Sequence, residues 1–459
     1  MPHDRAAASR AEEGSHAAGL AGACAVAGGA CLLLLPALWN GFPLLQWDTG
    51  GYLARWYEGH LVENRSTVYG LLLFALQTPS FWPCVVAQSA LATWIVALLL
   101  KTYGLTRPAH LMTAMGLLAT LTALPWLSSM LLTDILAGLA VVAFYLITLE
   151  AAPLGRLQRG GLAATIALAA ASHSATMLLV LGLTIAMVAP ALAIPGQVRR
   201  RGLALAAGAT AAGAMLLLAC NLAVSGRLAW TPGGASVLFA RMLEDGIVRR
   251  YLEEHCSDPR LRLCRYRREL PATADAFLWG GGENSIFNRL GRFEGLEDEM
   301  RTIAMDSLVL YPGEQIKAAA TATLRQLVAV GFGEGTVAYL PHTHGIIERF
   351  TPRWAPQMRA ARQQNGGLDK LPAINALHVP IALGSALALG AVLLQAARRK
   401  RLDPATQLAA VVILALIGNA AICGMLSNPH PRYGARLAWL APLALIVMAL
   451  RRRSARGEA

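Results

Sequence analysis

The chain has 459 residues, of which 55% are hydrophobic and only 15% are charged, and its mean hydropathy is +0.47. These values exceed those of soluble globular proteins and predict an all-α, polytopic membrane protein. The formal charge of +13 does not indicate nucleic-acid binding, because the arginines gather beside apolar runs, at 199–201, 398–401 and 451–453. Such clusters are typical of cytoplasmic loops.

The polar N-terminus leads into an apolar run at 17–38. No small-x-small cleavage site follows it, so we interpret it as a retained anchor rather than a signal peptide. Runs of about 20 residues predict ten spans in all. They are 17–38, 84–101, 107–127, 131–149, 160–175, 176–195, 202–224, 373–396, 405–426 and 434–450. With ten spans, both termini and all the arginine clusters fall on the cytoplasmic side.

The apolar stretch VYGLLLFALQ, residues 68–77, is too short to cross a bilayer core of about 30 Å as a helix. We predict an interfacial helix on the outer side instead. The outer face then receives the loop 39–83, the turn 172–174, the long segment 225–372 and the turn 427–433.

The chain is therefore predicted to divide into three parts. They are an N-terminal membrane module, 1–224, an extracytoplasmic insertion, 225–372, and C-terminal membrane helices with a basic cytoplasmic tail, 373–459. The apolar spacing at 236–254 and 294–330 predicts a helical, loop-rich insertion.

Two of the seven cysteines, Cys256 and Cys264, flank a proline-containing turn in this insertion, and the other five lie in apolar segments. In an oxidising compartment the pair is expected to form a disulfide, which stabilises a fold by about 2 to 3 kcal/mol for so short a loop. Two free thiols are the alternative.

Two aspartates lie next to predicted spans. Asp48, in the stretch QWDTGGYLARWYEGH, has the position of a general base at the membrane interface, or of an N-cap for a helix over 49–58. Asp134 opens the fourth span, where a carboxylate is costly and usually faces a polar cavity. A helix cap is again the alternative.

Several further polar residues lie on the predicted outer face. Arg65 is placed to bind a phosphate or to extend toward the membrane surface. His173 lies between two apolar runs, where it has either a structural role or a phosphate contact. Glu58 is a weaker candidate for substrate binding, since a solvated helix face explains it equally well.

The stretch SNPHPRYGARLAWL carries His430, Arg432 and Tyr433, with Arg436 one turn further on. Cations at the outer end of the last span are unexpected under the positive-inside rule, and a bound anion explains them. His342 and His344 have no supporting carboxylate or cysteine, so no metal site is predicted from them. A divalent metal elsewhere is left open.

The order and sidedness of these residues resemble the GT-C superfamily of polyprenyl-phosphate-sugar glycosyltransferases, and the layout is most similar to ArnT-like and protein O-mannosyltransferase-like enzymes. The resemblance covers 17–195 and 373–450. It departs from the family at 65–70, where RSTVYG replaces R-P-P-x-x-P, and at His173, where the family has lysine or arginine.

The resemblance implies an inverting transfer of sugar from a polyprenyl-phosphate carrier to an extracytoplasmic glycan, lipid or protein, at the periplasmic face of a bacterial inner membrane. Asp48 is then the base and Asp134 orders the pocket, while the lipid phosphate is bound by Arg65, His173, His430 and Arg432. No other cofactor is implied.

Two other functions remain open from the residues alone. A flippase or transporter of a lipid-linked saccharide also needs charge on the outer face, but it would be expected to show repeats or interrupted helices with polar residues at the midplane. A non-catalytic envelope assembly protein would use 225–372 to bind partners. An Asp48→Asn change tests both against an enzyme.

Overall fold

The computed structural model describes residues 2–149, 154–194, 196–230, 232–400 and 402–457. The fold is all-α, as predicted: 76% of the residues are helical and no strand occurs in the described ranges. Leu44 and Met130 form an isolated parallel bridge between two loops.

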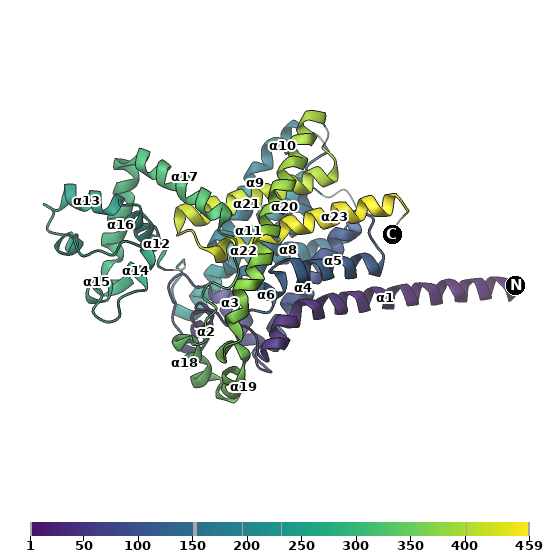
Figure 1. Cartoon of the computed structure of the whole chain (residues 1–459), viewed down its shortest axis with the longest axis horizontal. Helices are drawn as coiled ribbons and strands as arrows, with labels where there is room; N and C mark the ends of the chain where they lie inside the picture. Colours follow the sequence, from purple (N-terminus) through teal and green to yellow (C-terminus); the bar gives the residue numbers. More distant parts are fainter. Residues whose placement is uncertain (1, 150–153, 195, 231, 401, 458–459) are drawn as a thin grey trace.

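Seven helical segments are long and apolar enough to cross a membrane, and most of them form the bundle in Figure 1. A membrane protein is therefore supported by length and composition. The segments are Gly19–Asn40 of α1 (Pro2–Asn40), α4 (Trp82–Thr102), α9 and α10 (Ser174–Ala186, Val188–Ala193), α11 (Arg200–Ser225), Gly367–Arg399 with α20 (Leu371–Arg399), α21 (Pro404–Leu426), and α22 and α23 (Pro431–Ala438, Leu440–Ala455).

The three remaining predicted spans correspond to shorter helices. Helix α5 (Pro108–Leu121) has 14 residues and is followed by α6 (Leu124–Ser128), α7 (Asp134–Thr148) has 15 and α8 (Arg156–Ser172) has 17. At about 1.5 Å per residue, each is shorter than a bilayer core of about 30 Å. The structure thus supports seven spans, and the count of ten stays a prediction.

Helix α7 lies at the centre of the bundle. All of its side chains are buried, and it packs against α4, α8, α11 and α22. Gly138 permits a close contact with Trp439, which follows α22, because a Cβ at this position would lie 2.6 Å from the buried ring of Trp439. A buried helix of this kind is apolar on every side, which is why its sequence reads as a membrane span.

The two ends of α7 differ in charge. At its C-terminal end, Thr148 accepts a hydrogen bond of 2.8 Å from the backbone of Arg199, and Tyr103, hydrogen-bonded to the last turn, lies 5.6 Å from the guanidinium of Arg451. We call this the basic end. At the other end, about 22 Å away by helix length, is Asp134, and we call this the aspartate end.

Two short helices follow α1 at the aspartate end, α2 (Thr49–Glu58) and α3 (Thr67–Ala75). Helix α3 is the predicted interfacial helix. It begins at Ser66, whose hydroxyl accepts hydrogen bonds from the backbone of Val68 and Tyr69, and it packs against α2.

The segment 225–372 contributes to two separate cores. Its first part projects from the bundle (Figure 1) and has its own core, which includes Phe239 and Leu296, whereas Ile347 and Met358 join the core of the bundle. Helix α17 connects the two by packing on α21. The helices are α12 (Gly234–Glu244), α13 (Ile247–His255), α14 (Ala274–Leu278), α15 (Ile286–Arg289), α16 (Arg292–Leu310), α17 (Pro312–Val328), α18 (Pro341–Phe350) and α19 (Ala355–Ala360), with 3₁₀ turns at Arg262–Tyr266, Pro352–Trp354, Arg362–Gln364 and Gly367–Lys370.

Cys256 and Cys264 form a disulfide, the pairing that the sequence analysis expected. The bond closes the loop between α13 and the 3₁₀ turn that follows, and both cysteines pack against the core of the projecting part. The disulfide therefore belongs to a small core of its own rather than to the bundle.

Candidate functional site

Asp48 and Asp134 are brought together by two adjacent loops. The backbone of Leu44 accepts a hydrogen bond of 3.0 Å from Leu131 and donates one of 2.9 Å to Ser129. Each aspartate follows this pairing by about one helical turn. Residues 86 positions apart in the chain therefore meet at the aspartate end of the bundle.

The carboxylate of Asp48 does not cap α2. The residue precedes the helix, as the N-cap alternative requires, but its side chain makes no capping hydrogen bond. Instead, one oxygen pairs with Arg65 and the other lies 2.6 Å from Nη1 of Arg432. Only 11% of the side chain is exposed, so this is a nearly buried, doubly paired carboxylate.

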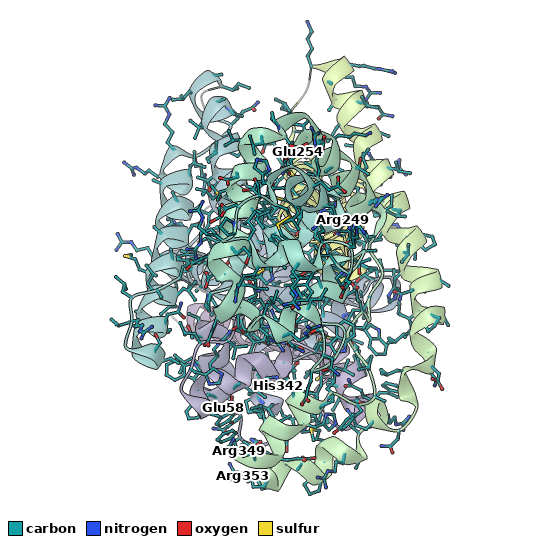
Figure 2. The ribbon with its side chains drawn as sticks, turned by 90° about the vertical axis from the view of Figure 1, so that its left-hand side faces the viewer. Glu58, Arg249, Glu254, His342, Arg349 and Arg353 are labelled. Atoms are coloured by element: carbon teal, nitrogen blue, oxygen red, sulfur yellow. A yellow bond between two sulfur atoms is a disulfide. The ribbon has the colours of Figure 1, made fainter. Side chains whose placement is uncertain are left out.

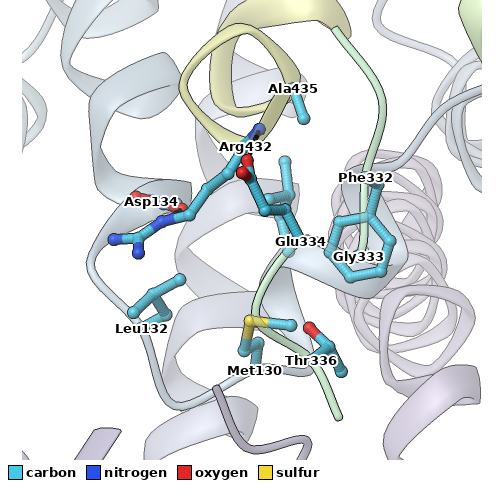
Figure 3. A pocket seen from close by; sticks show the side chains of 10 residues that line it. Met130, Leu132, Asp134, Phe332, Gly333, Glu334, Thr336, Arg432 and Ala435 are labelled. Carbon is cyan, nitrogen blue, oxygen red and sulfur yellow. Dashed lines mark hydrogen bonds and ion pairs between the residues drawn. The ribbon is translucent and has the colours of Figure 1, made fainter. Parts of the chain in front are cut away.

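Arg432, from the first turn of α22, bridges the two aspartates. Its Nε donates to Asp134 over 2.9 Å while its Nη1 pairs with Asp48 (Figure 3 shows Arg432 beside Asp134). Asp134 is 2% exposed, and its second oxygen is buried without a hydrogen-bond partner among the described residues. Asp134 begins α7, so its carboxylate also lies at the positive end of that helix dipole.

The two arginines determine the acidity of Asp48. Burial raises the pKa of this carboxyl, but the charges of Arg65 and Arg432 outweigh burial and lower the pKa to about 2. Asp48 is thus fully ionised at neutral pH and is a weak proton acceptor as long as both ion pairs are intact.

A third guanidinium lies behind this pair. Arg436, also on α22, is fully buried, and its nitrogens donate to the amide oxygen of Asn419 over 2.9 and 2.5 Å. It also donates to Nδ1 of His173 over 3.4 Å, since arginine has no acceptor. The part of the chain that the structure describes gives Arg436 no carboxylate partner. His173 therefore joins the cluster through Arg436.

His430 and Tyr433 flank Arg432 in different ways. His430 Nδ1 lies 2.6 Å from Glu334, and its Nε2 lies 3.6 Å from Asp275. Burial lowers the pKa of His430, but the hydrogen bond and charge of Glu334 outweigh it and raise the pKa. The ring of Tyr433 lies 5.6 Å from the guanidinium of Arg432, a cation–π distance.

Glu58 does not reach this cluster. It lies in the last turn of α2, about 15 Å along the helix from Asp48. There it lies 3.8 Å from His60 and 3.9 Å from Arg349, and Figure 2 shows it near His342 and Arg349 at the edge of the molecule. The geometry gives Glu58 a surface ion pair and no place in the site.

Arg55 fixes the loop that carries Arg65. It is fully buried in α2, and its Nη2 donates to the backbone carbonyls of Val62 and Arg65. Burial lowers the pKa of Arg55 to about 9, which leaves it charged at neutral pH. Its role is to hold the 62–65 loop against α2.

The segment Phe332–Thr336 closes over the site. Together with Asp134 and Arg432 it lines a cavity of only about 10 Å³, roughly the space of one water (Figure 3). Glu334 binds the backbone nitrogen of Arg432 over 3.1 Å, and Trp47 donates a hydrogen bond of 3.1 Å to Gly335. Gly335 has a φ of +74°, a conformation that favours glycine.

Within the part of the chain that the structure describes, the acidic side chains of the site are paired with arginines rather than grouped with other metal ligands. Among the described residues, no three His, Cys, Asp or Glu side chains are grouped to hold an ion. Both aspartates are instead paired with Arg432. The donor set therefore gives no support to the divalent metal that the sequence analysis left open.

Sequence reasoning missed three contributors. Glu334 lies in a glycine-rich turn, GFGEG, which reads as a loop. Asn419 is a polar residue inside the apolar span 405–426. Such a residue can have a functional or a packing role, and the sequence alone does not distinguish the two. Arg55 lies within the stretch that contains Asp48, but only the fold shows that it supports Arg65.

Comparisons with known proteins add no family. No protein-family model matches the chain, no curated protein matches it, and no solved structure matches it.

Proposed function

We propose that the protein is an inverting membrane glycosyltransferase that moves a sugar from a polyprenyl-phosphate carrier to an extracytoplasmic acceptor. The observation that supports this most is the cluster at the aspartate end, in which Arg65, Arg432 and Arg436 lie with Asp48 and Asp134. It combines cations for a phosphate with a carboxylate for proton transfer.

The charge of this cluster fits the reaction. Three guanidiniums and two carboxylates leave one positive charge, which a sugar phosphodiester would neutralise. When the acceptor oxygen bonds to the anomeric carbon and the carbon–oxygen bond to phosphate breaks, the phosphate gains a second negative charge. The proton of the acceptor passes to Asp48, and the carboxylate thereby loses its negative charge. The total charge of the cluster thus stays at zero, which avoids a large electrostatic cost in a buried site.

Donor binding also prepares Asp48 as a base. In the structure its pKa is about 2, because two arginines hold it. A phosphate that binds Arg65 and Arg432 competes for those cations, and the pKa of Asp48 then rises toward the range of a useful base. Asp134 keeps Arg432 in place through its Nε.

The site must open to admit the donor, since a cavity of about 10 Å³ excludes a sugar. The segment 331–336 is expected to move, because it contains three glycines and covers Arg432 through Glu334. The acceptor and the lipid carrier would enter through the same opening.

The membrane arrangement is part of the proposal. We place ten spans across a bacterial inner membrane, with the basic end and both termini in the cytoplasm and 225–372 in the periplasm. The clustering of arginines at the basic end supports this orientation through the positive-inside rule. The aspartate end then faces a compartment without nucleotide sugars, where lipid-linked donors are the available sugar source.

The test is sugar transfer from a panel of radiolabelled polyprenyl-phosphate sugars in proteoliposomes, with and without Asp48→Asn. Loss of general-base catalysis is expected to reduce the rate about 10² to 10⁴-fold. Glu58→Gln is the matched control, because Glu58 lies outside the cluster, and it should retain activity. Unchanged transfer by Asp48→Asn would refute the mechanism.

A wild-type protein that transfers no sugar from any donor, yet moves the lipid-linked sugar across the vesicle membrane, would establish the flippase instead. Leaflet-specific oxidation of the labelled sugar distinguishes the two results in the same proteoliposomes.

A further inference from the structure

A cavity lies at the basic end of the bundle, far from the aspartates. It has a volume of about 490 Å³ and lies where α7 ends and where α8 and α11 begin. Since Asp134 opens α7 and this cavity is at the opposite end of the same helix, the two sites are separated by the length of α7.

Four arginines line this cavity, and no carboxylate occurs among its described lining residues. They are Arg159 from α8 and the run 199–201 at the start of α11. Two of them are oriented by backbone contacts: Arg159 Nε donates to Leu154 over 3.1 Å and Arg200 Nε donates to Ala191 over 3.3 Å. Their terminal nitrogens have no hydrogen bond to another described residue, so they remain available to a ligand.

The start of α11 adds to the positive potential. No side chain caps its first turn, and the backbone N–H groups there carry the positive end of the helix dipole. Gly202 allows this turn to approach α7, because a Cβ at that position would collide with the carbonyl of Ile147. The start of α11 is thereby placed against the end of α7, with Arg200 and Arg201 exposed beside it.

The rest of the lining is apolar. Ile147 and Leu154 are buried, whereas Leu205, on the next turn of α11, is 37% exposed. A water-soluble anion would not need this apolar lining for its binding. A phosphate group attached to an acyl chain uses both surfaces, and basic pockets between membrane helices bind anionic headgroups in this way.

We propose that this cavity binds the phosphate headgroup of an anionic membrane phospholipid, with the first part of an acyl chain along Leu205. The guanidiniums of Arg159, Arg200 and Arg201 hold the phosphate, and the lipid fastens the beginnings of α8 and α11 to the end of α7. The site is separate from the sugar-transfer site and does not depend on the proposed function.

The test is native mass spectrometry of the delipidated full chain with added phosphatidylglycerol or phosphatidylcholine of the same acyl composition. We expect preferential binding of phosphatidylglycerol, reduced about tenfold or more in Arg159→Gln/Arg200→Gln, since each arginine near an anionic lipid contributes substantially. The control is Arg452→Gln/Arg453→Gln, which removes the same charge from the end of α23 and should retain binding.

Three results would overturn the proposal. Equal loss in the control pair would show diffuse surface attraction, and equal binding of both lipids would exclude headgroup recognition. Competition by soluble glycerol phosphate at the concentration of the lipid would identify a water-soluble ligand instead. Arg159→Lys/Arg200→Lys, which keeps the charge, should retain most of the binding, and unfolding midpoints of all variants show whether a loss reflects misfolding.

Discussion

The two ends of α7 both gather arginines, but they use them differently. At the aspartate end Arg436 is fully buried, and Arg432, whose side chain is only 13% exposed, is fixed by two carboxylates within 3 Å. At the basic end, Arg200 and Arg201 are exposed beside a cavity of about 490 Å³ with no carboxylate among its described lining. The first arrangement is closed and two of its three guanidiniums are paired with carboxylates, whereas the second is open and its described lining contains arginines without carboxylates.

This difference shows that arginine clusters in one membrane protein need different explanations. Solvated arginines at a membrane surface cost little and determine topology. A buried arginine is tolerated only with partners, so its position has to be specified by the fold. Perturbing each end should therefore give effects of very different size.

The largest effect on stability is expected from Arg432→Gln. The change leaves Asp48 and Asp134 buried without their shared cation, and breaking a buried ion pair costs about 3 to 5 kcal/mol. Thermal unfolding in detergent measures the loss. Arg65→Gln removes only one partner of Asp48 and should cost less, so equal losses for the two variants would contradict the bridging role of Arg432.

The second largest effect is expected to be a loss of folding stability at acidic pH. The pKa of Asp48 is lowered from 3.8 to about 2, so the ionised form stabilises the fold above pH 4, and this contribution disappears as the pH falls toward 2. The shift corresponds to about 2 kcal/mol. The unfolding midpoint of the wild type should fall more steeply across this window than that of Asp48→Asn. Parallel curves would show that Asp48 is not ion-paired.

His430 is expected to have a smaller effect on stability, and this contribution is lost as the pH rises rather than as it falls. Its pKa is raised by Glu334, so the protonated form stabilises the fold below pH 6.5, and the contribution is lost as the pH rises through the folded pKa. A hydrogen bond between charged groups contributes about 1.5 to 3 kcal/mol, and partial exposure places this pair at the low end. Glu334→Gln should flatten the decline of the wild-type unfolding midpoint as the pH rises above 6.5. An unchanged decline would show that another group causes it.

The smallest effect is expected at the basic end. Arg200→Gln/Arg201→Gln in detergent without anionic lipid should change the free energy of unfolding by less than about 0.5 kcal/mol, because both residues are exposed. A loss comparable to that of Arg432→Gln would mean that the two ends are not different in kind. Differential scanning fluorimetry of the two variants side by side makes the comparison directly.

The sequence determined the class of this protein through local physics. Apolar composition and run length predicted helices near all ten expected positions, and seven of these segments are long enough to span a membrane. The short stretch 68–77 was correctly expected to be a helix. The disulfide between Cys256 and Cys264, which was expected from their position around a turn in the predicted extracytoplasmic segment, is also confirmed. These features depend on neighbouring residues, which a sequence displays directly.

The tertiary structure decided which polar residues meet. Asp48, Arg65, Asp134 and Arg432 were each found as isolated candidates, but only the pairing of Leu44 with the 129–131 loop and the position of α22 bring them into contact. Glu58 lies outside the site because it is at the far end of α2 from Asp48, which precedes this helix. Charge pairing in a buried site depends on distances between helices, and these are determined by packing rather than by spacing along the chain.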